Sequence, residues 1–185
     1  MQILLKHIAN IQTGIFAKSE PQGDIVYLQA KHFDEEGLLH SSLHRELKQD
    51  IFISRHLLQP GDVLFAAKGT KNFAAIYEKR NDPAVASTSF FVIRLFEKNI
   101  LPEFLVWYLN YPSTQRILKG KAIGTSIASI SKTVLEELEI SIPDIETQKS
   151  ILKITELRNA EKKLKQQIET LKEKQIQNHL LNALK

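Results

Sequence analysis

The sequence holds few residues whose types and spacing could form an active site. It has no cysteine, no GxGxxG or phosphate-binding loop, and no HExxH or GxSxG motif, so the commonest nucleophile, cofactor and zinc arrangements are missing. His40 and His44 are four residues apart and could place two imidazoles on one helical face, but they lie in a polar, loop-like segment. We therefore predict no catalytic residue, no metal site and no cofactor bound by this chain.

Polar and basic residues gather instead in three loop-like segments. Between Glu103 and Glu136 there is no acidic residue, and the basic residues there are Arg116, Lys119, Lys121 and Lys132. Residues 68–72 (KGTKN) form a second basic segment and residues 13–18 (TGIFAK) a third. Glycine lets backbone amides approach a phosphate, and hydroxyl groups can donate to phosphate or reach base edges. The three segments indicate nucleic-acid binding, but exposed lysines also gather in loops that bind nothing, so the residues alone leave both interpretations open.

The elements that must position these segments are short strands and helices. Apolar runs bounded by Gly, Pro, Asn or Asp predict strands at residues 24–30, 62–67, 73–77, 88–95 and 138–142. Helices are predicted over residues 103–110 and 113–120, the second with Ser113 as N-cap, and Ser131 caps a further turn. Asn110-Tyr111-Pro112 is similar to a substrate-binding motif of amino-methyltransferases without its second proline, and the end of a helix explains it better. Residues 1–143 are thus predicted to form an α+β domain with a twisted, mostly antiparallel sheet.

Residues 144–185 contain neither glycine nor proline and predict one long helix, with Asp144 as N-cap. About 40 helical residues would extend roughly 60 Å. Apolar residues recur at intervals of three or four, or of seven where Glu161 interrupts, and shift in phase after the sixth: Ile151, Ile154, Leu157, Leu164, Ile168, Leu171, Ile176, Leu180 and Leu184. A stripe this narrow is typical of a coiled-coil helix that pairs with another helix, and the alternative is packing on its own domain. Residues 151–185 also hold 8 basic and 4 acidic side chains, a surplus that could face phosphate or water.

Composition excludes several classes of protein. The chain has 185 residues, 43% hydrophobic and 25% charged, which fits one globular domain with an appendage and excludes disordered, collagen-like and disulfide-rich chains. The apolar run at residues 3–5 is too short for a signal peptide, and no later run approaches the length of a membrane span. We expect a cytoplasmic protein. The net charge of +4 permits a polyanionic partner without requiring one.

Four features resemble the DNA specificity (S) subunits of type I restriction-modification systems. They are IANIQTG at residues 8–14, LLQPGDVLFAAKGT at 57–70, GTSIASISKTVLEELEISIPDIETQKSI at 124–151, and the long C-terminal helix. Together they extend over essentially the whole chain, and the run from Gly124 to Ile151 is the most specific. The family's usual Pro-Pro-Leu-x-Glu-Gln before the helix reads IPDIETQ here, at residues 142–148. This departure leaves open how closely the entry to the helix follows the family.

The resemblance implies a non-catalytic subunit that reads double-stranded DNA and positions adenine-methyltransferase subunits, which bind S-adenosylmethionine. Restriction subunits complete such complexes. The usual S subunit carries two recognition domains and two helices that pair antiparallel, whereas this chain resembles half a subunit, with domains at 1–143 and 144–185; a cloned fragment is the alternative. The resemblance thus implies a homodimer, joined through the helix, that reads the two halves of an interrupted, inverted-repeat site.

Base-contacting residues vary within such a family, so the DNA contacts are predicted from this sequence alone. They are Lys18, Lys68, Lys71, Asn72, Arg80, Lys121, Thr125, Ser126 and Lys132. The lysines are assigned mainly to phosphate, and Asn72, Thr125 and Ser126 lie closer to base edges. The rival interpretation is a non-catalytic coiled-coil scaffold without DNA recognition.

Overall fold

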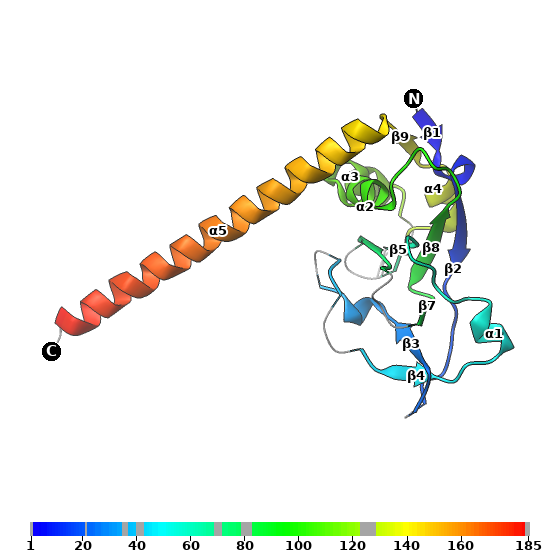
Figure 1. Ribbon diagram of the computed structural model, residues 1–185, viewed down its shortest axis with the longest axis horizontal. Coiled ribbons are helices and arrows are strands. Elements are labelled where there is room, and N and C mark those ends of the chain that lie inside the picture. Colours follow the sequence, from blue (N-terminus) through cyan, green and yellow to red (C-terminus); the bar gives the residue numbers. More distant parts are fainter. Residues whose placement is uncertain are drawn as a thin grey trace. The chain divides into compact units, whose positions relative to one another are not determined.

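The computed structural model describes residues 2–20, 22–34, 37–39, 43–68, 72–78, 83–122 and 129–183. The chain divides into two compact units, Met1–Ile145 and Glu146–Lys185. Short strands and helices make up the first unit, and a single helix makes up the second (Figure 1). The predicted α+β class and the predicted long C-terminal helix are both confirmed.

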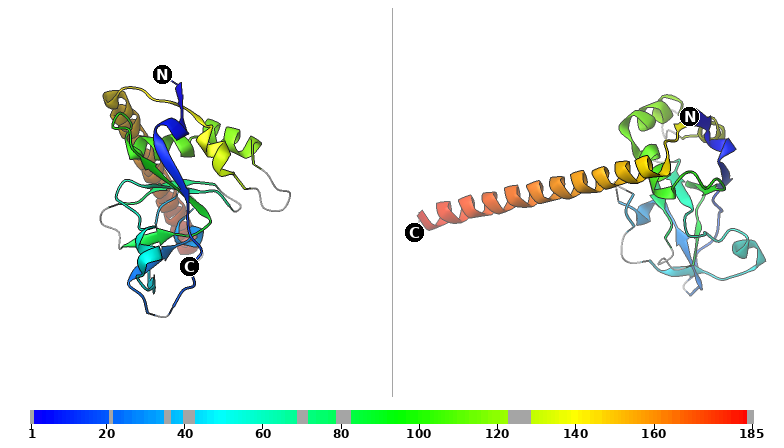
Figure 2. Two further views of the ribbon diagram at one scale, coloured as in Figure 1. Left: turned by 90° about the vertical axis from the view of Figure 1, so that its right-hand side faces the viewer. Right: turned by 45° about the horizontal axis from the view of Figure 1, so that its top comes forward.

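The largest sheet of the first unit is antiparallel throughout. Its strands, in spatial order, are β2 (Ala9–Thr13), β8 (Phe90–Leu95), β5 (Val63–Ala66) and β6 (Ala74–Ile76). β8 lies between β2 and β5, and its residue Phe91 is opposite both Thr13 and Phe65. Figures 1 and 2 show β2 and β8 side by side and running in opposite directions. Three of these strands, β5, β6 and β8, were predicted from the sequence.

Two smaller sheets divide what was predicted as a single sheet. The first contains β4 (Arg45–Leu47), β3 (Ile25–Leu28) and β7 (Ala84–Ala86), and the second contains β1 (Gln2–Leu4) and β9 (Glu139–Ser141). β3 and β7 are parallel, which departs from an all-antiparallel arrangement. The division arises because the chain leaves the large sheet after β2, where Ile15 forms a parallel bridge to Ser87. β1, β2, β4 and β7 were not predicted.

Short helices connect and cover the strands. They are the 3-10 turns η1 (Leu5–His7) and η2 (Ala30–His32) and the helices α1 (Ile51–Ser54), α2 (Pro102–Asn110), α3 (Pro112–Gly120) and α4 (Lys132–Glu136). The hydroxyl of Ser131 accepts the Val134 N–H at 3.2 Å, which confirms the predicted cap of α4. The predicted Ser113 cap is wrong, because α3 already begins at Pro112 with Tyr111 in the N-cap position. Proline suits that first position, since its ring fixes φ and no N–H is needed there.

The main hydrophobic core joins the two larger sheets. It contains residues of β3 and β7 from one sheet and of β5, β6 and β8 from the other, all at most 8% exposed. Phe33, Phe73 and Phe90 form an aromatic cluster within it, with ring centroids 5.5 to 6.1 Å apart. Burying each such ring stabilises the fold by roughly 1.5–3 kcal/mol, so the core fixes the two sheets against each other.

The Pro60-Gly61-Asp62 motif closes the turn that leads into β5. Gly61 has φ +93°, a conformation that glycine adopts readily. The Asp62 carboxylate, 1% exposed, accepts hydrogen bonds from Arg94 Nε and Nη2, both at 2.7 Å, and from the Gln59 N–H at 2.7 Å. The hydrogen bonds to Asp62 and its charge raise the pKa of Arg94, although burial acts in the opposite direction. This bidentate ion pair fastens the start of β5 to β8.

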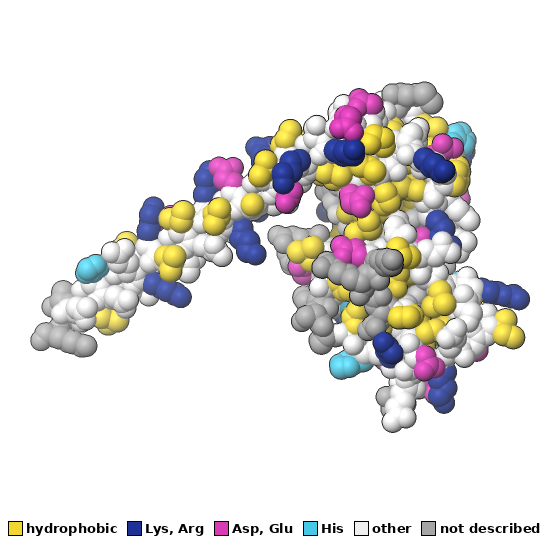
Figure 3. Space-filling model, viewed as in Figure 1, with side chains coloured by type: hydrophobic (Ala, Val, Ile, Leu, Met, Phe, Trp, Pro, Cys, Tyr) yellow, Lys and Arg dark blue, Asp and Glu magenta, His cyan; other side chains and the backbone are white. Residues whose placement is uncertain are grey.

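The second unit is α5 (Ile145–Ala183), a helix of 39 residues. Seven predicted stripe residues, Ile154, Leu157, Leu164, Ile168, Leu171, Ile176 and Leu180, are 51–64% exposed, while Ile151 is half-buried and Leu184 lies outside the described residues. Figure 3 shows hydrophobic side chains alternating with Lys and Arg along the visible face of this helix. Among the described helices, α5 included, none combines the length and the apolar character that crossing a membrane requires.

The Asp62–Arg94 pair provides a test of the fold. Replacing Asp62 with Asn should lower the free energy of unfolding by about 2 kcal/mol, because it breaks a bidentate pair whose carboxylate is buried while Arg94 can still reach water. Urea denaturation followed by circular dichroism measures this change. The exposed Asp24→Asn is the matched control and should change stability by less than about 0.5 kcal/mol. Equal stabilities of the two variants would contradict the proposed structural role of the motif.

Candidate nucleic-acid interface

Strand register brings two of the predicted basic segments, those that begin after Thr13 and after Ala66, to one end of the large sheet. β2 ends at Thr13 and β5 at Ala66, while β6 begins at Ala74 and β8 at Phe90. Ala66 is opposite Phe90 in the pairing of β5 with β8, and Thr13 is opposite Phe91 in the pairing of β2 with β8. The segments that follow Thr13 and Ala66 therefore leave the sheet at the same end, beside the Ser87-Thr88-Ser89 turn between β7 and β8.

A short bridge joins the 68–72 loop to the segment that precedes α4. Lys68 pairs with Ser129 in an isolated antiparallel bridge, and the Ile130 N–H donates to the Ala67 carbonyl at 3.0 Å. The Ala67 N–H in turn donates to the Ser89 carbonyl at 2.9 Å. Ile130 is 1% exposed and anchors the junction, whereas the Lys68 side chain is exposed. Two segments more than 50 residues apart in sequence thus form one surface, which we name the Lys68–Ser129 junction.

Lys121 and Lys132 lie on either side of this junction along the chain. Lys121 follows the last residue of α3 and is exposed. Lys132 is the first residue of α4, three positions after Ser129, and its ammonium lies 3.4 Å from the Glu136 carboxylate. A surface pair of this kind contributes little stability and is readily exchanged for a phosphate contact. The structure therefore brings Lys68 close to the segment that leads into Lys132, whereas Lys121 lies eight positions before Ser129 along the chain, and its place beside the junction stays a prediction.

Asn72 has a structural bond that the sequence did not predict. Its Nδ2 donates to the Ala66 carbonyl at 2.9 Å, which closes the loop between β5 and β6. The side chain of Asn110 holds the far end of the same loop, because its Oδ1 accepts the Ala74 N–H at 2.7 Å and its Nδ2 donates to the Ala74 carbonyl at 2.8 Å. Asn110 thus ties the end of α2 to the edge strand β6, which explains the Asn110-Tyr111-Pro112 motif structurally.

Lys18 lies apart from the junction. Between Ile15, which hydrogen bonds to the β7 residue Ala86, and Glu20, which bonds to the β4 residue Glu46, the chain runs beside the smaller three-stranded sheet. Gly14 makes this exit from β2 feasible, since a Cβ there would lie 2.1 Å from the Ser87 carbonyl oxygen. Lys18 is exposed, and so is the neighbouring Phe16, at 82%. Any DNA contact by Lys18 would extend the interface beyond the junction.

Four of the predicted DNA contacts, Lys71, Arg80, Thr125 and Ser126, lie outside the described residues. Their roles, and those of the described lysines toward phosphate, stay predictions. Within the described part of the chain, no three His, Asp or Glu side chains come close enough together to hold a metal ion.

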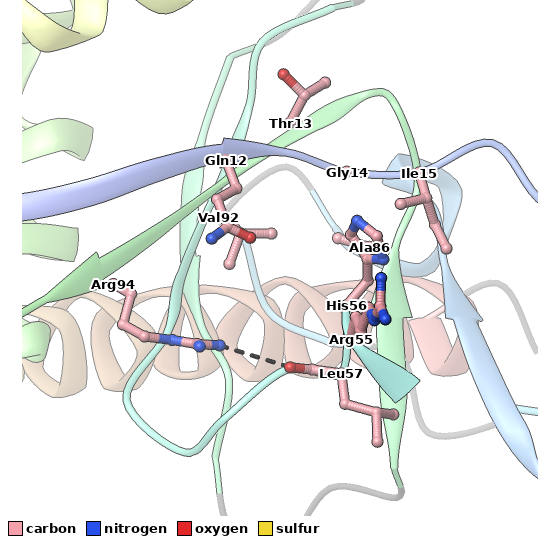
Figure 4. Close-up of a pocket in the computed structure, with 10 residues that line it drawn as sticks. All are labelled: Gln12, Thr13, Gly14, Ile15, Arg55, His56, Leu57, Ala86, Val92 and Arg94. Atoms are coloured by element: carbon pink, nitrogen blue, oxygen red, sulfur yellow. Dashed lines mark hydrogen bonds between the residues drawn. The ribbon is translucent and has the colours of Figure 1, made fainter. Parts of the chain in front are cut away.

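A small hollow near the end of β2 is lined by Arg55, His56 and Arg94, which were not predicted as DNA contacts from the sequence. Its volume is about 20 Å³, and its lining includes Gln12, Thr13, Arg55, His56 and Arg94 (Figure 4). Arg94 is committed to Asp62 and to the Leu57 carbonyl, at 3.5 Å, but Arg55 is exposed and carries a further positive charge. The sequence could have indicated this basic site through the adjacent Arg55 and His56, which directly follow α1. We did not single them out because this segment lacks the glycines present in the other basic segments.

The arrangement as a whole is a basic, hydroxyl-bearing surface without a catalytic constellation among the described residues. The exposed lysines can contact phosphates, and the partly exposed Thr88, Ser89 and Ser129 offer hydroxyls. Its backbone is held by strand pairing and by the Asn110 clamp. Such a surface can bind a polyanion and position it.

Comparisons with known proteins point to one family. The sequence profile of the family described as "Type I restriction modification DNA specificity domain" matches residues 4–170. A curated relative, the putative type I restriction enzyme MjaX specificity subunit of Methanocaldococcus jannaschii, is 30% identical over 115 residues, which are 59% of this chain and 26% of that protein.

Solved structures of the same type share the fold. A chain in a structure of a type I R-M system aligns with a TM-score of 0.63 and 16% identity, covering 87% of this chain and 38% of that one. The S subunit of a type I restriction-modification system from M. genitalium aligns with a TM-score of 0.61 and 16% identity, covering 86% and 39%. This chain therefore spans about a quarter of the curated relative and under two-fifths of the solved chains.

The Asn110 clamp can be tested directly. Asn110→Ala removes both hydrogen bonds to Ala74 and should lower the free energy of unfolding by about 2 kcal/mol. Hydrogen exchange of the Ala74 amide should become at least tenfold faster relative to the Ile93 amide in the middle of β8. Exchange that is unchanged at Ala74 would show that the clamp does not hold the loop between β5 and β6.

Proposed function

The chain belongs to the type I restriction modification DNA specificity domain family, and from this premise we propose that its first unit reads a DNA sequence at the Lys68–Ser129 junction. The observation that carries the proposal is that two separate basic segments, one beginning at Lys68 and one leading to Lys132, meet at one end of the large sheet. Strand register and the Lys68–Ser129 bridge produce this convergence, which the family membership alone does not specify.

Different residues of the junction would contact different parts of the duplex. Lys68, Lys121 and Lys132 are assigned to phosphates, because long, exposed ammonium groups supply affinity without sequence information. Arg55, beside the small hollow, would add a further phosphate contact. Sequence reading requires short polar groups close to base edges. The hydroxyls of Thr88, Ser89 and Ser129 are the candidates, because the backbone of Ser89 hydrogen bonds to Ala67 and Ser129 pairs with Lys68.

The helix α5 would join two copies of the chain. Its apolar side chains are more than half exposed, and a stripe of this width fits one partner helix of the same kind. Antiparallel pairing would give a two-fold symmetric homodimer with one recognition unit per half-site. Such a dimer would read an inverted repeat interrupted by a spacer that the protein does not contact.

We assign the chemistry to partner subunits. In this proposal the dimer positions adenine-methyltransferase subunits, which bring S-adenosylmethionine, and restriction subunits join the same assembly. Methylation requires the adenine to be turned out of the duplex into the partner's pocket, so the chain contributes by fixing where on the DNA that pocket lies. The exposed α5 also suits the rival function, a scaffold without DNA recognition, and the salt dependence of DNA binding distinguishes the two.

The first experiment measures DNA affinity at several salt concentrations for the chain, alone and with the subunits that co-purify with it. Replacing Lys68 and Lys121 together with Ala should weaken binding to all sequences. It should also reduce the slope of log K against log salt by about two, because two phosphate contacts are lost.

A matched double variant controls for the loss of charge. Lys6 and Lys98 are exposed and lie at the opposite end of the large sheet, before β2 and after β8 respectively. Lys6→Ala with Lys98→Ala removes the same two charges and should leave the slope unchanged. Equal slopes for the two double variants would exclude the junction as the DNA surface, and no salt-dependent binding at all would favour the scaffold.

The dimer is tested by sedimentation equilibrium. Leu164→Lys places a charge in the middle of the apolar stripe and should reduce the mass from two chains to one, because that charge would be buried on pairing. The side chain is 59% exposed in a single chain, so folding is not at risk. Gln166→Lys introduces the same residue on the opposite face of α5 and should leave the dimer intact. A monomeric parent chain at high concentration and on DNA would refute the pairing.

A further inference from the structure

The middle of α5 carries a heptad seam that can pair with itself. From Ile154 the spacing alternates three and four residues through Leu157, Glu161, Leu164, Ile168 and Leu171. Alternation of three and four is the a/d pattern of a two-stranded coiled coil. Reversed end to end, the same series matches itself, so an antiparallel partner places Ile154 against Leu171 and Leu157 against Ile168.

After Leu171 the apolar residues move to another face of the helix. Ile176 follows five residues later, and five residues advance an α-helix by about 140° beyond a full turn. Ile176, Leu180 and Leu181 are 53–62% exposed. Ile176 lies about one turn before Leu180 and Leu181, and the three form a second apolar patch on this other face of the helix. They cannot face the same partner helix as the seam does, so a different apolar surface must cover them if they are buried.

The register of the seam predicts which residues of the second copy lie beside Leu180 and Leu181. When Ile154 is level with Leu171 of the second copy, Leu180 is level with its Ile145 and Leu181 with its Asp144. These are the residues at which α5 begins. The last turns of one helix therefore end beside the segment that leads into the other.

A hollow of about 420 Å³ lies at that segment. It is lined by Ile3 of β1 and by Asn99, Ile142, Pro143, Asp144 and Ile145. Most of its lining surface is apolar, and four of its six lining residues, Ile3, Ile142, Pro143 and Ile145, are hydrophobic. Its volume is sufficient for two leucine or isoleucine side chains at the packing density of a protein interior.

We propose that this hollow receives Leu180 and Leu181 from the α5 helix of a second copy of the chain. The inference rests on the proposed antiparallel dimer and adds to it a contact between the helix end of one copy and the first unit of the other. By symmetry the contact occurs twice, once at each end of the paired helices.

The area of the seam shows why such a contact is needed. A leucine or isoleucine buries about 100 Å² of apolar surface, so the five apolar seam residues of each copy supply at most about 1,000 Å² between them. Stable interfaces bury about 1,200–2,000 Å². Burying Ile176, Leu180 and Leu181 of both copies as well raises the total to about 1,600 Å², the size of a standard interface.

The end contacts would also set the geometry of DNA reading. Seating the second helix in the hollow would give each recognition unit a further contact with the dimer, because the hollow is formed by residues of β1 and of the segment that enters α5. The dimer would thus hold its recognition units at a fixed spacing and rotation.

Cysteine cross-linking tests the contact without background, because the full chain contains no cysteine. Ile142→Cys with Leu180→Cys should give a covalent dimer in most of the protein under mild oxidation, since disulfides form only when the Cα atoms come within about 7 Å. A bond within one chain is excluded, because α5 separates the two positions by roughly 50 Å. Leu157→Cys with Ile168→Cys, both in the seam, reports the antiparallel pairing by itself.

The outcomes separate the two proposals. Cross-linking of both pairs, with each single-cysteine variant remaining monomeric on a denaturing gel, supports the end contact. Cross-linking of the seam pair alone overturns the end contact and leaves the antiparallel dimer standing. Failure of both pairs refutes the dimer and the contact together, and self-cross-linking of Leu180→Cys alone would show a parallel pairing that excludes the contact.

Discussion

The position of β8 between β2 and β5 is the constraint on which the rest of the recognition unit depends. Its antiparallel register decides that the segments after Thr13 and Ala66 leave the sheet at one end. Phe90 and Ile93 lie on opposite faces of β8 and both are buried, so a shift of one residue would exchange the two faces and disrupt the packing on each. The Asp62–Arg94 pair adds a polar restraint to the same strand. The candidate DNA surface is therefore a consequence of how one strand is held.

Three residues of the runs at 8–14 and 57–70, which resemble the family, prove to have structural roles. Gly14 is required by the close approach of the Ser87 carbonyl, Gly61 by its positive φ, and Asp62 by its ion pair with Arg94. None of these residues needs to contact DNA to explain its presence. Fixed turns and strands that carry variable loops would allow related chains to read different sequences on one framework.

Much of the fold could be predicted from the sequence, because β3, β5 and β8 are continuous apolar runs and α2, α3 and α5 carry proline or helix-former signals. Three of the four missed strands, β1, β4 and β7, are only three residues long and form through partners distant in sequence. The basic loops were recognisable by composition, but their convergence was not, since the Lys68–Ser129 bridge depends on strand register. Arg55 lies beside the end of β2 although it comes from a separate segment, and the sequence does not show this proximity.

The central claim is that this chain decides which DNA sequence is methylated. The most direct test maps adenine methylation across the genome of the native cell, with the gene intact and with it deleted. The account predicts that deletion abolishes methylation at one motif, an inverted repeat interrupted by an unspecified spacer, and that returning the gene restores it. An unchanged methylation map, in a cell that expresses the chain together with its partners, would contradict the account.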